Sequence, residues 1–200
     1  MKEFKELTKI QKEKLADIAS NWWANKISGN FHHDNGDKSK GGQFAMFLAD
    51  LGKKQLTQDQ INNFKTDLKI EIINAFEESY NCYEMSLDCD YNPDYLLRKC
   101  AEKHDINSLN FPFKTSLYIS PTAVTVRDGY MVGLVEIFAT KEYYENKIEN
   151  AKDYIKQCEE YKKDKNNFIM PAEYDKMIED RKQHIFNWQK IIIENKYDSF

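Results

Sequence analysis

Apolar residues recur at helical spacing through the first eighty residues of the chain. Thr8-x-x-Gln11 is a capping box and opens one such pattern, which ends near Ile27. A second capping box, Thr57-x-x-Gln60, opens the most regular pattern, which runs to about residue 79. Between them, residues 43–52 form a shorter pattern with Phe44, Phe47, Leu48 and Leu51 on one face. The sequence therefore predicts three helices, connected in part by a polar loop at residues 31–42.

Alternation of apolar and polar residues replaces this pattern between residues 86 and 138. It predicts strands at 86–91, 115–120, 123–127 and 131–138, the last of them the most buried. Asn92-Pro93-Asp94 opens a short helix after the first strand, in which Tyr95, Leu96 and Cys100 are expected to face inward. The later connections are too short for crossovers, which favours an antiparallel sheet of three or four strands. Alternatively, residues 124–138 form one long strand bent by a bulge at Gly129-Tyr130.

The last sixty residues carry two heptad-like patterns. Their apolar seam follows positions 144, 148, 151, 155 and 158, then 174, 178, 181, 185, 188 and 192, and the second helix begins at Pro171. A short connection between them predicts an antiparallel coiled-coil hairpin. The expected fold is thus α+β: N-terminal helices packed on a small antiparallel sheet, followed by an antiparallel coiled-coil helical hairpin. The expected domains are an α+β domain at 1–139 and a helical hairpin appendage at 140–200.

Charge is distributed unevenly along the chain. Residues 57–139 contain 7 basic and 13 acidic residues, whereas residues 1–56 contain 10 basic and 7 acidic ones. This balance argues against sequence-specific DNA binding, which requires a basic face. The acidic residues could form a solvated face, or a patch that meets a basic groove on a partner. The expected partner-binding residues are Glu77, Glu78, Glu84, Asp88, Asp90 and Asp94. Of the adjacent Trp22 and Trp23, one is expected in the core, and Trp22 is the candidate for a partner contact.

The sequence contains none of the searched motifs for nucleophilic catalysis or phosphate binding, so no catalytic residue and no cofactor are expected. The four cysteines match no zinc spacing and are expected to be reduced thiols. An alternative is a metal-dependent hydrolase or nuclease that uses His32, His33, Asp34, Asp37, Asp88 and Asp90 as ligands. No leader or membrane span is expected, which favours the cytoplasm of a bacterial host.

Several segments in fixed order resemble one group of proteins. These are Trp22-Trp23-Ala24, Asp34-Asn35-Gly36-Asp37, Phe44 to Ala49, Leu87 to Pro93, Phe111 to Thr115, Val124-Thr125-Val126 and Gly129-Tyr130. They resemble uncharacterised small proteins carried on phages, plasmids and conjugative elements of Firmicutes-like bacteria, across roughly residues 15–135. The resemblance implies an accessory role on a mobile element and, by analogy of context, an anti-CRISPR-type inhibitor.

These observations together give one expected function and two alternatives. The expected function is a non-enzymatic inhibitor that binds a bacterial defence effector, either a nuclease or its RNA complex, and blocks a nucleic-acid groove with its acidic surface. The alternatives are the metal-dependent enzyme and a regulatory module of a mobile element that dimerises through residues 140–200.

Overall fold

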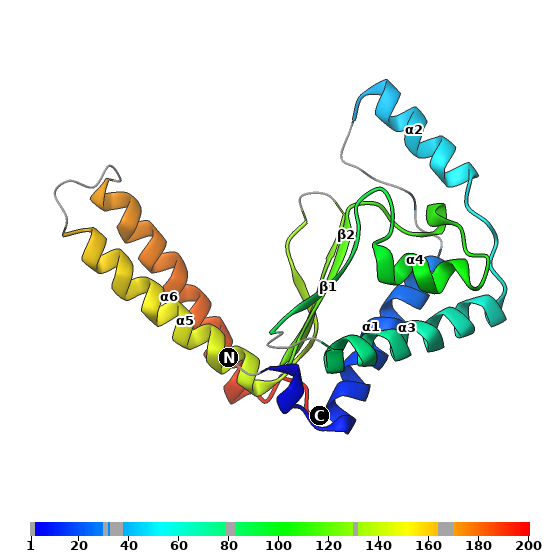
Figure 1. The fold of residues 1–200 in the computed structure, drawn as a ribbon. Coiled ribbons are helices and arrows are strands. Elements are labelled where there is room, and N and C mark those ends of the chain that lie inside the picture. Colours follow the sequence, from blue (N-terminus) through cyan, green and yellow to red (C-terminus); the bar gives the residue numbers. More distant parts are fainter. Residues whose placement is uncertain (1–2, 30–31, 33–37, 79–82, 130–131, 164–169) are drawn as a thin grey trace. The chain divides into compact units, whose positions relative to one another are not determined.

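The computed structural model describes residues 3–29, 32, 38–78, 83–129, 132–163 and 170–200. Within these ranges the protein is α+β, with six α-helices and a four-stranded antiparallel sheet (Figure 1). The chain divides into two compact units, residues 1–138 with Phe200, and residues 139–199. That the chain forms two domains at 1–139 and 140–200 stays a prediction, because a division into compact units does not show that either folds alone.

The described part of the first unit holds four α-helices, and a side chain caps the start of each: Thr8, Ser39, Thr57 and Asp94. The helices are α1 (Lys9–Ser28), α2 (Lys40–Leu51), α3 (Gln58–Glu78) and α4 (Tyr95–Glu102), with 3-10 turns at Phe4–Glu6 and Ser108–Asn110. The Gln11 amide donates to Thr8 Oγ1 at 3.3 Å, and the Thr8 amide donates to Gln11 Oε1 at 3.0 Å. Thr57 and Gln60 make the same reciprocal pair. Both predicted capping boxes are therefore confirmed.

The sheet has the order β1-β2-β3-β4, so strands that are neighbours in the sheet are also consecutive along the chain. Its strands are β1 (Met85–Cys89), β2 (Thr115–Ser120), β3 (Ala123–Asp128) and β4 (Val135–Ala139). Leu87 pairs with Leu117, and Leu117 pairs with Val126, so these three apolar side chains share one face. The predicted order of helices, sheet and helices holds only in part, and α4 lies between β1 and β2, where the sequence predicted a short helix. The alternative of one long bent strand over 124–138 is wrong.

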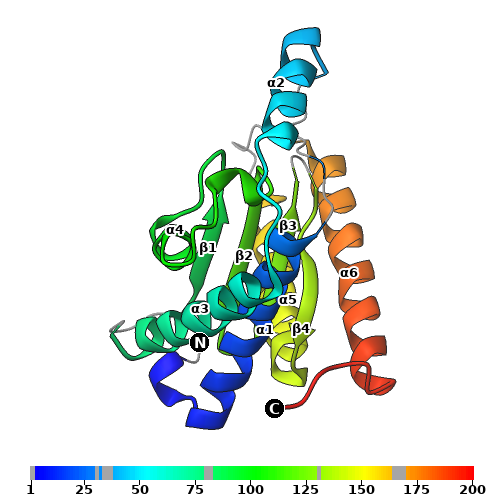
Figure 2. The ribbon, with the colours of Figure 1, turned by 90° about the vertical axis from the view of Figure 1, so that its right-hand side faces the viewer.

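One core joins the helices to this face of the sheet. Helix α1 packs on β2 and β3, and α3 packs on α1 and α4 (Figure 2). Trp23 of α1 is fully buried against Phe111, with ring centroids 5.9 Å apart. The core also contains the apolar residues Leu15, Ala19, Phe64, Leu68, Ile72, Leu87, Leu97, Leu117, Ile119 and Val124. The best-patterned predicted helix, α3, thus supplies its predicted face to the core.

Two predictions about which side chains are buried are wrong. Tyr95 is 69% exposed, and Leu97 is buried in its place. The reason is helical phase: Asp94 caps α4, so Leu97, Cys100 and Ala101 face inward together, and Tyr95 points away. The last strand is shorter than predicted, and Val135 is 55% exposed. Because β4 is an edge strand, its first residues have sheet on one side only.

The second unit consists of α5 (Lys141–Tyr161) and α6 (Pro171–Ile193), which lie side by side and antiparallel (Figure 1). Cys158, Tyr174 and Ile178 are buried together between them. The Arg181 guanidinium lies 4.8 Å from the centre of the Tyr154 ring. The helical pair is therefore observed, and four of its buried residues are Tyr144, Ile148, Tyr174 and Ile178, which lie on the predicted seam. No helix in the described part of the chain has the length and apolar character to span a bilayer.

Candidate protein-binding surfaces

The six acidic residues predicted to bind a partner follow one another from the end of α3 to the start of α4. We call Glu77, Glu78, Glu84, Asp88, Asp90 and Asp94 the acidic segment. Glu77 and Glu78 lie in the last turn of α3, which contains no basic residue. The C-terminal end of a helix carries partial negative charge, so two carboxylates are electrostatically unfavourable there. The interaction of these two charges with the helix dipole therefore does not stabilise α3.

Two members of the acidic segment have structural roles. Glu77 Oε1 accepts a hydrogen bond from Lys12 Nζ at 2.7 Å, and Lys12 is only 6% exposed. Asp94 accepts two backbone hydrogen bonds of 2.9 Å, from the amides of Leu97 and Asp88. Burial raises the pKa of the Asp94 carboxyl, and these two hydrogen bonds oppose the shift only in part. Glu77 thus joins α1 to α3, and Asp94 joins β1 to α4.

The remaining members are accessible. Glu78, Glu84 and Asp90 are exposed, and Asp88 is half-buried. Asp90 forms an ion pair with Lys114, whose Nζ also lies 4.3 Å from the centre of the Tyr91 ring. The hydrogen bond to Asp90 raises the pKa of Lys114. The negative charge of Asp90 is therefore partly balanced, and Glu78 and Glu84 are further exposed carboxylates of the acidic segment.

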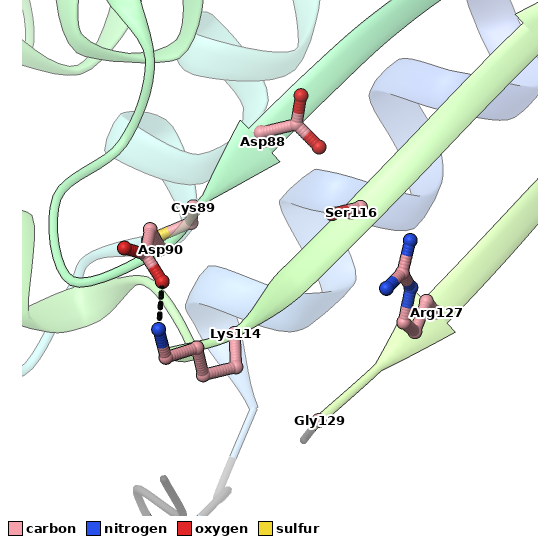
Figure 3. A pocket seen from close by; sticks show the side chains of 7 residues that line it. All are labelled: Asp88, Cys89, Asp90, Lys114, Ser116, Arg127 and Gly129. Atoms are coloured by element: carbon pink, nitrogen blue, oxygen red, sulfur yellow. Dashed lines mark ion pairs between the residues drawn. The ribbon is translucent and has the colours of Figure 1, made fainter. Parts of the chain in front are cut away.

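A hollow of about 440 Å³ opens on the sheet beside Asp88 and Asp90 (Figure 3). Asp88 on β1, Ser116 on β2 and Arg127 on β3 are aligned across the three strands. The small Ser116 side chain lies between the two charged ones, and Lys114 and Gly129 border the same hollow. Arg127 also donates a hydrogen bond of 2.7 Å to the Tyr118 hydroxyl. The hollow thus has Asp88 and the Asp90–Lys114 ion pair on one side and Arg127 on the other, and it can receive a charged side chain of a partner.

Trp22 lies in a second layer over the core. It is half-buried and meets Trp23 edge to face, with ring centroids 5.0 Å apart. Lys26 Nζ lies 5.3 Å from the centre of the Trp22 ring and pairs with Asp128. Trp23 is therefore the core member of the tryptophan pair. The partner contact of Trp22 stays a prediction.

Helix α2 presents a surface that the sequence analysis did not assign to binding. Its four large apolar residues lie on one face, as predicted, but that face is exposed rather than packed. Phe44 is 62%, Phe47 57%, Leu48 50% and Leu51 66% exposed. The buried residues of the helix are the small Gly42 and Ala49. The periodicity identified the face, but periodicity alone does not indicate whether the same chain covers it.

The described residues contain no cluster of three or more His, Cys, Asp or Glu side chains that could hold a metal ion. Of the proposed ligands, His33, Asp34 and Asp37 lie outside the described residues. His32 Nδ1 lies 3.1 Å from Asp50 Oδ2, and Asp88 and Asp90 line the hollow on the sheet. The structure therefore does not test whether these six residues meet.

Two buried thiols are poorly suited to nucleophilic chemistry. Burial, together with the nearby Asp94, Asp90 and Asp88 charges, raises the pKa of Cys89 to about 12. Burial also raises the pKa of Cys100 to about 11, with a further contribution from Glu71. A thiol with such a pKa is almost entirely protonated at neutral pH, and the thiolate is the reactive form. Cys89 and Cys100 are thus explained as packed core residues.

Comparison with models of known protein families gives no match, and comparison with curated proteins gives no relative. The resemblance to proteins of phages and conjugative elements therefore stays a prediction.

Proposed function

We propose that this protein is a non-enzymatic inhibitor that binds a bacterial defence effector, a nuclease or its RNA complex, in the manner of an anti-CRISPR protein. The acidic segment enters a groove that the effector uses for nucleic acid. The observation that carries the proposal is the exposure of three carboxylates of the acidic segment, Glu78, Glu84 and Asp90, together with a last turn of α3 that contains no basic residue. Exposed carboxylates are accessible to the cations of another molecule.

Electrostatics explains why such a surface would select an effector. Grooves that bind nucleic acid are lined by Lys and Arg, which make most of their contacts to phosphates. Carboxylates placed in such a groove meet the same cations, and the long-range attraction accelerates association. The hollow beside Asp88 adds a specific contact, because a basic side chain of the effector can enter it and pair with that carboxylate.

The helical pair supplies the second part of the proposal. We propose that α5 and α6 form an antiparallel coiled coil, which the burial of Tyr144, Ile148, Tyr174 and Ile178 at heptad positions supports. Ile193 and Phe186 of α6 are 78% and 61% exposed. These side chains are available for a further contact, either with the effector or with a second copy of the chain.

Charge reversal tests the acidic segment. The test variant is Glu78→Lys, Glu84→Lys, Asp88→Lys and Asp90→Lys, which leaves the structural carboxylates of Glu77 and Asp94 in place. The matched control reverses Glu159, Glu160, Glu179 and Asp180, four exposed acids of the helical pair, and changes net charge equally. Both variants and the natural chain are titrated against a panel of purified guide-loaded CRISPR nucleases in a DNA-cleavage assay. The proposal predicts inhibition of at least one nuclease, lost in the test variant and kept in the control. Inhibition of none, or equal loss in both variants, would contradict it.

The metal-dependent enzyme is the second candidate, and it depends on the loop that contains His32, His33, Asp34 and Asp37. It predicts that Mn²⁺, Mg²⁺ or Zn²⁺ raises the thermal unfolding midpoint, because a ligand that binds only the folded state stabilises it. An unchanged midpoint with all three ions would exclude this candidate.

The dimerising module is the third candidate, and exposed Ile193 favours it. It predicts that the full chain sediments with twice its mass of 23.7 kDa. A mass of 23.7 kDa at micromolar concentration would exclude it.

A further inference from the structure

We infer that helix α2 is a docking element that inserts into an apolar groove, rimmed by acidic residues, on a partner protein. The inference goes beyond the proposed function, because it concerns a surface other than the acidic segment and holds for any protein partner. It starts from the spacing of the exposed residues. Phe44, Phe47, Leu48 and Leu51 follow the i, i+3, i+4, i+7 pattern by which single helices bind in grooves.

The two faces of α2 differ in the size and exposure of their side chains. At 3.6 residues per turn, the four exposed apolar residues span about 100° of the helix, and Gly42 and Ala49 lie roughly opposite them. The small residues of α2 are therefore buried, and its large apolar residues Phe44, Phe47, Leu48 and Leu51 are exposed. Globular proteins normally have the reverse arrangement. We call Phe44, Phe47, Leu48 and Leu51 the α2 stripe.

The end of α2 is held in place by the rest of the unit. The Asn107 side chain donates to the Gly52 carbonyl at 3.3 Å, immediately after the helix. Asn110 binds both backbone groups of Lys54: its Nδ2 donates to the carbonyl at 2.7 Å, and its Oδ1 accepts from the amide at 3.3 Å. Asn110 is itself buried. These contacts fix the C-terminal end of α2 while leaving the α2 stripe uncovered by its own unit.

Charge indicates what covers the α2 stripe. Residues 38–54 contain four lysines, Lys38, Lys40, Lys53 and Lys54, and one acid, Asp50. Lys53 pairs with Asp50 at 2.9 Å and Lys54 pairs with Asp105 at 2.8 Å, so Lys38 and Lys40 supply the positive charge that concerns a partner. Lys40 lies one turn before Phe44, on the same face as the stripe and at the helix N-terminus, where a cation is unfavourable. A groove with carboxylates at its rim complements this arrangement.

The same charges argue against pairing of α2 with a second copy. A parallel pair brings Lys40 next to its own copy. The area is also small: four side chains, each roughly half exposed, offer on the order of 400 Å² per copy. Two copies would then bury about 800 Å², less than the roughly 1,200–2,000 Å² of a stable interface. A groove encloses the helix on more than one side and buries more of it.

A photo-crosslinking experiment tests the inference in the full chain. The probe is p-benzoylphenylalanine at position 47, activated in bacterial cells, with the adduct peptide identified by mass spectrometry. The control places the same probe at Gln43, which is exposed but lies beside the stripe. The inference predicts one protein adduct at position 47, located in an apolar segment flanked by Asp or Glu. The adduct should be at least tenfold weaker from position 43.

Two substitutions in the probe-bearing chain separate the apolar and electrostatic parts of the inference. Leu51→Glu is expected to reduce the adduct at least tenfold, and Lys40→Glu severalfold, whereas Lys176→Glu on exposed α6 should leave it within twofold. Because Leu51 and Lys40 are exposed, the thermal unfolding midpoint should not change. An adduct with a second copy, with residues 139–199 of the same chain or with lipid, or no adduct, would overturn the inference. Loss of inhibition on reversal of the acidic segment, with the adduct retained, would leave both proposals standing on separate surfaces.

Discussion

Replacement of Asp94 tests whether this member of the acidic segment stabilises the fold. Its carboxylate caps α4 through the Leu97 amide and holds β1 through the Asp88 amide, both at 2.9 Å. Loss of a helix cap costs about 1 kcal/mol, and a hydrogen bond to a charged group contributes about 1.5–3 kcal/mol. The substitution also removes the desolvation cost of a partly buried carboxylate, which offsets some of this loss, since burial raises the pKa of Asp94. We therefore expect Asp94→Ala to lower the free energy of unfolding by about 2 kcal/mol.

A graded series separates the two hydrogen bonds. Serine is a good cap but too short to reach the Asp88 amide as well, so Asp94→Ser should cost about 1 kcal/mol, half as much as alanine. The assay is urea unfolding followed by tryptophan fluorescence in a Trp188→Phe background, so that Trp22 and Trp23 report on their own unit. A loss below about 0.5 kcal/mol for Asp94→Ala, or equal losses for both variants, would refute the assigned roles.

The difference in free energy of unfolding between the natural chain and Asp94→Ala should depend on pH in a defined direction. The pKa of Asp94 is raised above its ordinary value of 3.8 in the folded state. The stabilisation linked to this shift is fully present below 3.8 and is lost as pH rises through the folded pKa. The stability difference between the natural chain and Asp94→Ala should therefore be larger near pH 4 than near pH 7. The opposite trend would show that the charged carboxylate is the stabilised form.

Three further predictions follow from described contacts. Glu77→Gln should lower the free energy of unfolding in urea by about 1–2 kcal/mol, because it leaves the buried Lys12 ammonium without its counter-charge. The control Glu78→Gln should lower it by less than about 0.5 kcal/mol, and equal losses would contradict the pairing. Gly41→Ala should increase helix content in circular dichroism, because an alanine is favoured in helices by about 1 kcal/mol and its Cβ would meet only Ser39 Oγ, at 3.9 Å; unchanged helix content would oppose it. Cys89 and Cys100 should resist iodoacetamide in the folded chain near pH 8 and react in urea, as followed by peptide mass spectrometry. Rapid labelling of either thiol in the folded chain would disprove its buried, protonated state.

Local signals in the sequence predicted much of the fold. Thr8 and Thr57 mark helix starts because capping depends on residues three positions apart. The alternation in β2 predicts which residues are buried, since Leu117 and Ile119 face the core along the whole strand. These features depend on neighbours in sequence, so no knowledge of the tertiary structure is needed.

The errors arise where distant residues decide the outcome. Tyr95 is exposed because Asp94 sets the phase of α4, and this depends on the bond between Asp94 and the Asp88 amide. The α2 stripe is exposed because no other described helix or strand of its unit covers it. The acidic balance of residues 57–139 suggested an acidic patch, yet Lys12, Lys114 and Lys99 pair with its carboxylates Glu77, Asp90 and Glu71. Pairing across the fold cannot be inferred from the order of charges along one segment.

The measurement that tests the central proposal most directly is a competition between this protein and nucleic acid for one effector. A guide-loaded nuclease that the chain inhibits is titrated with fluorescent target DNA at several fixed concentrations of the chain, at low and at high salt. If the acidic segment occupies the nucleic-acid groove, the apparent Kd for DNA rises in proportion to the concentration of the chain, and salt weakens this effect. If the DNA and the chain bind the effector together, with an unchanged apparent Kd, the acidic segment does not occupy the groove.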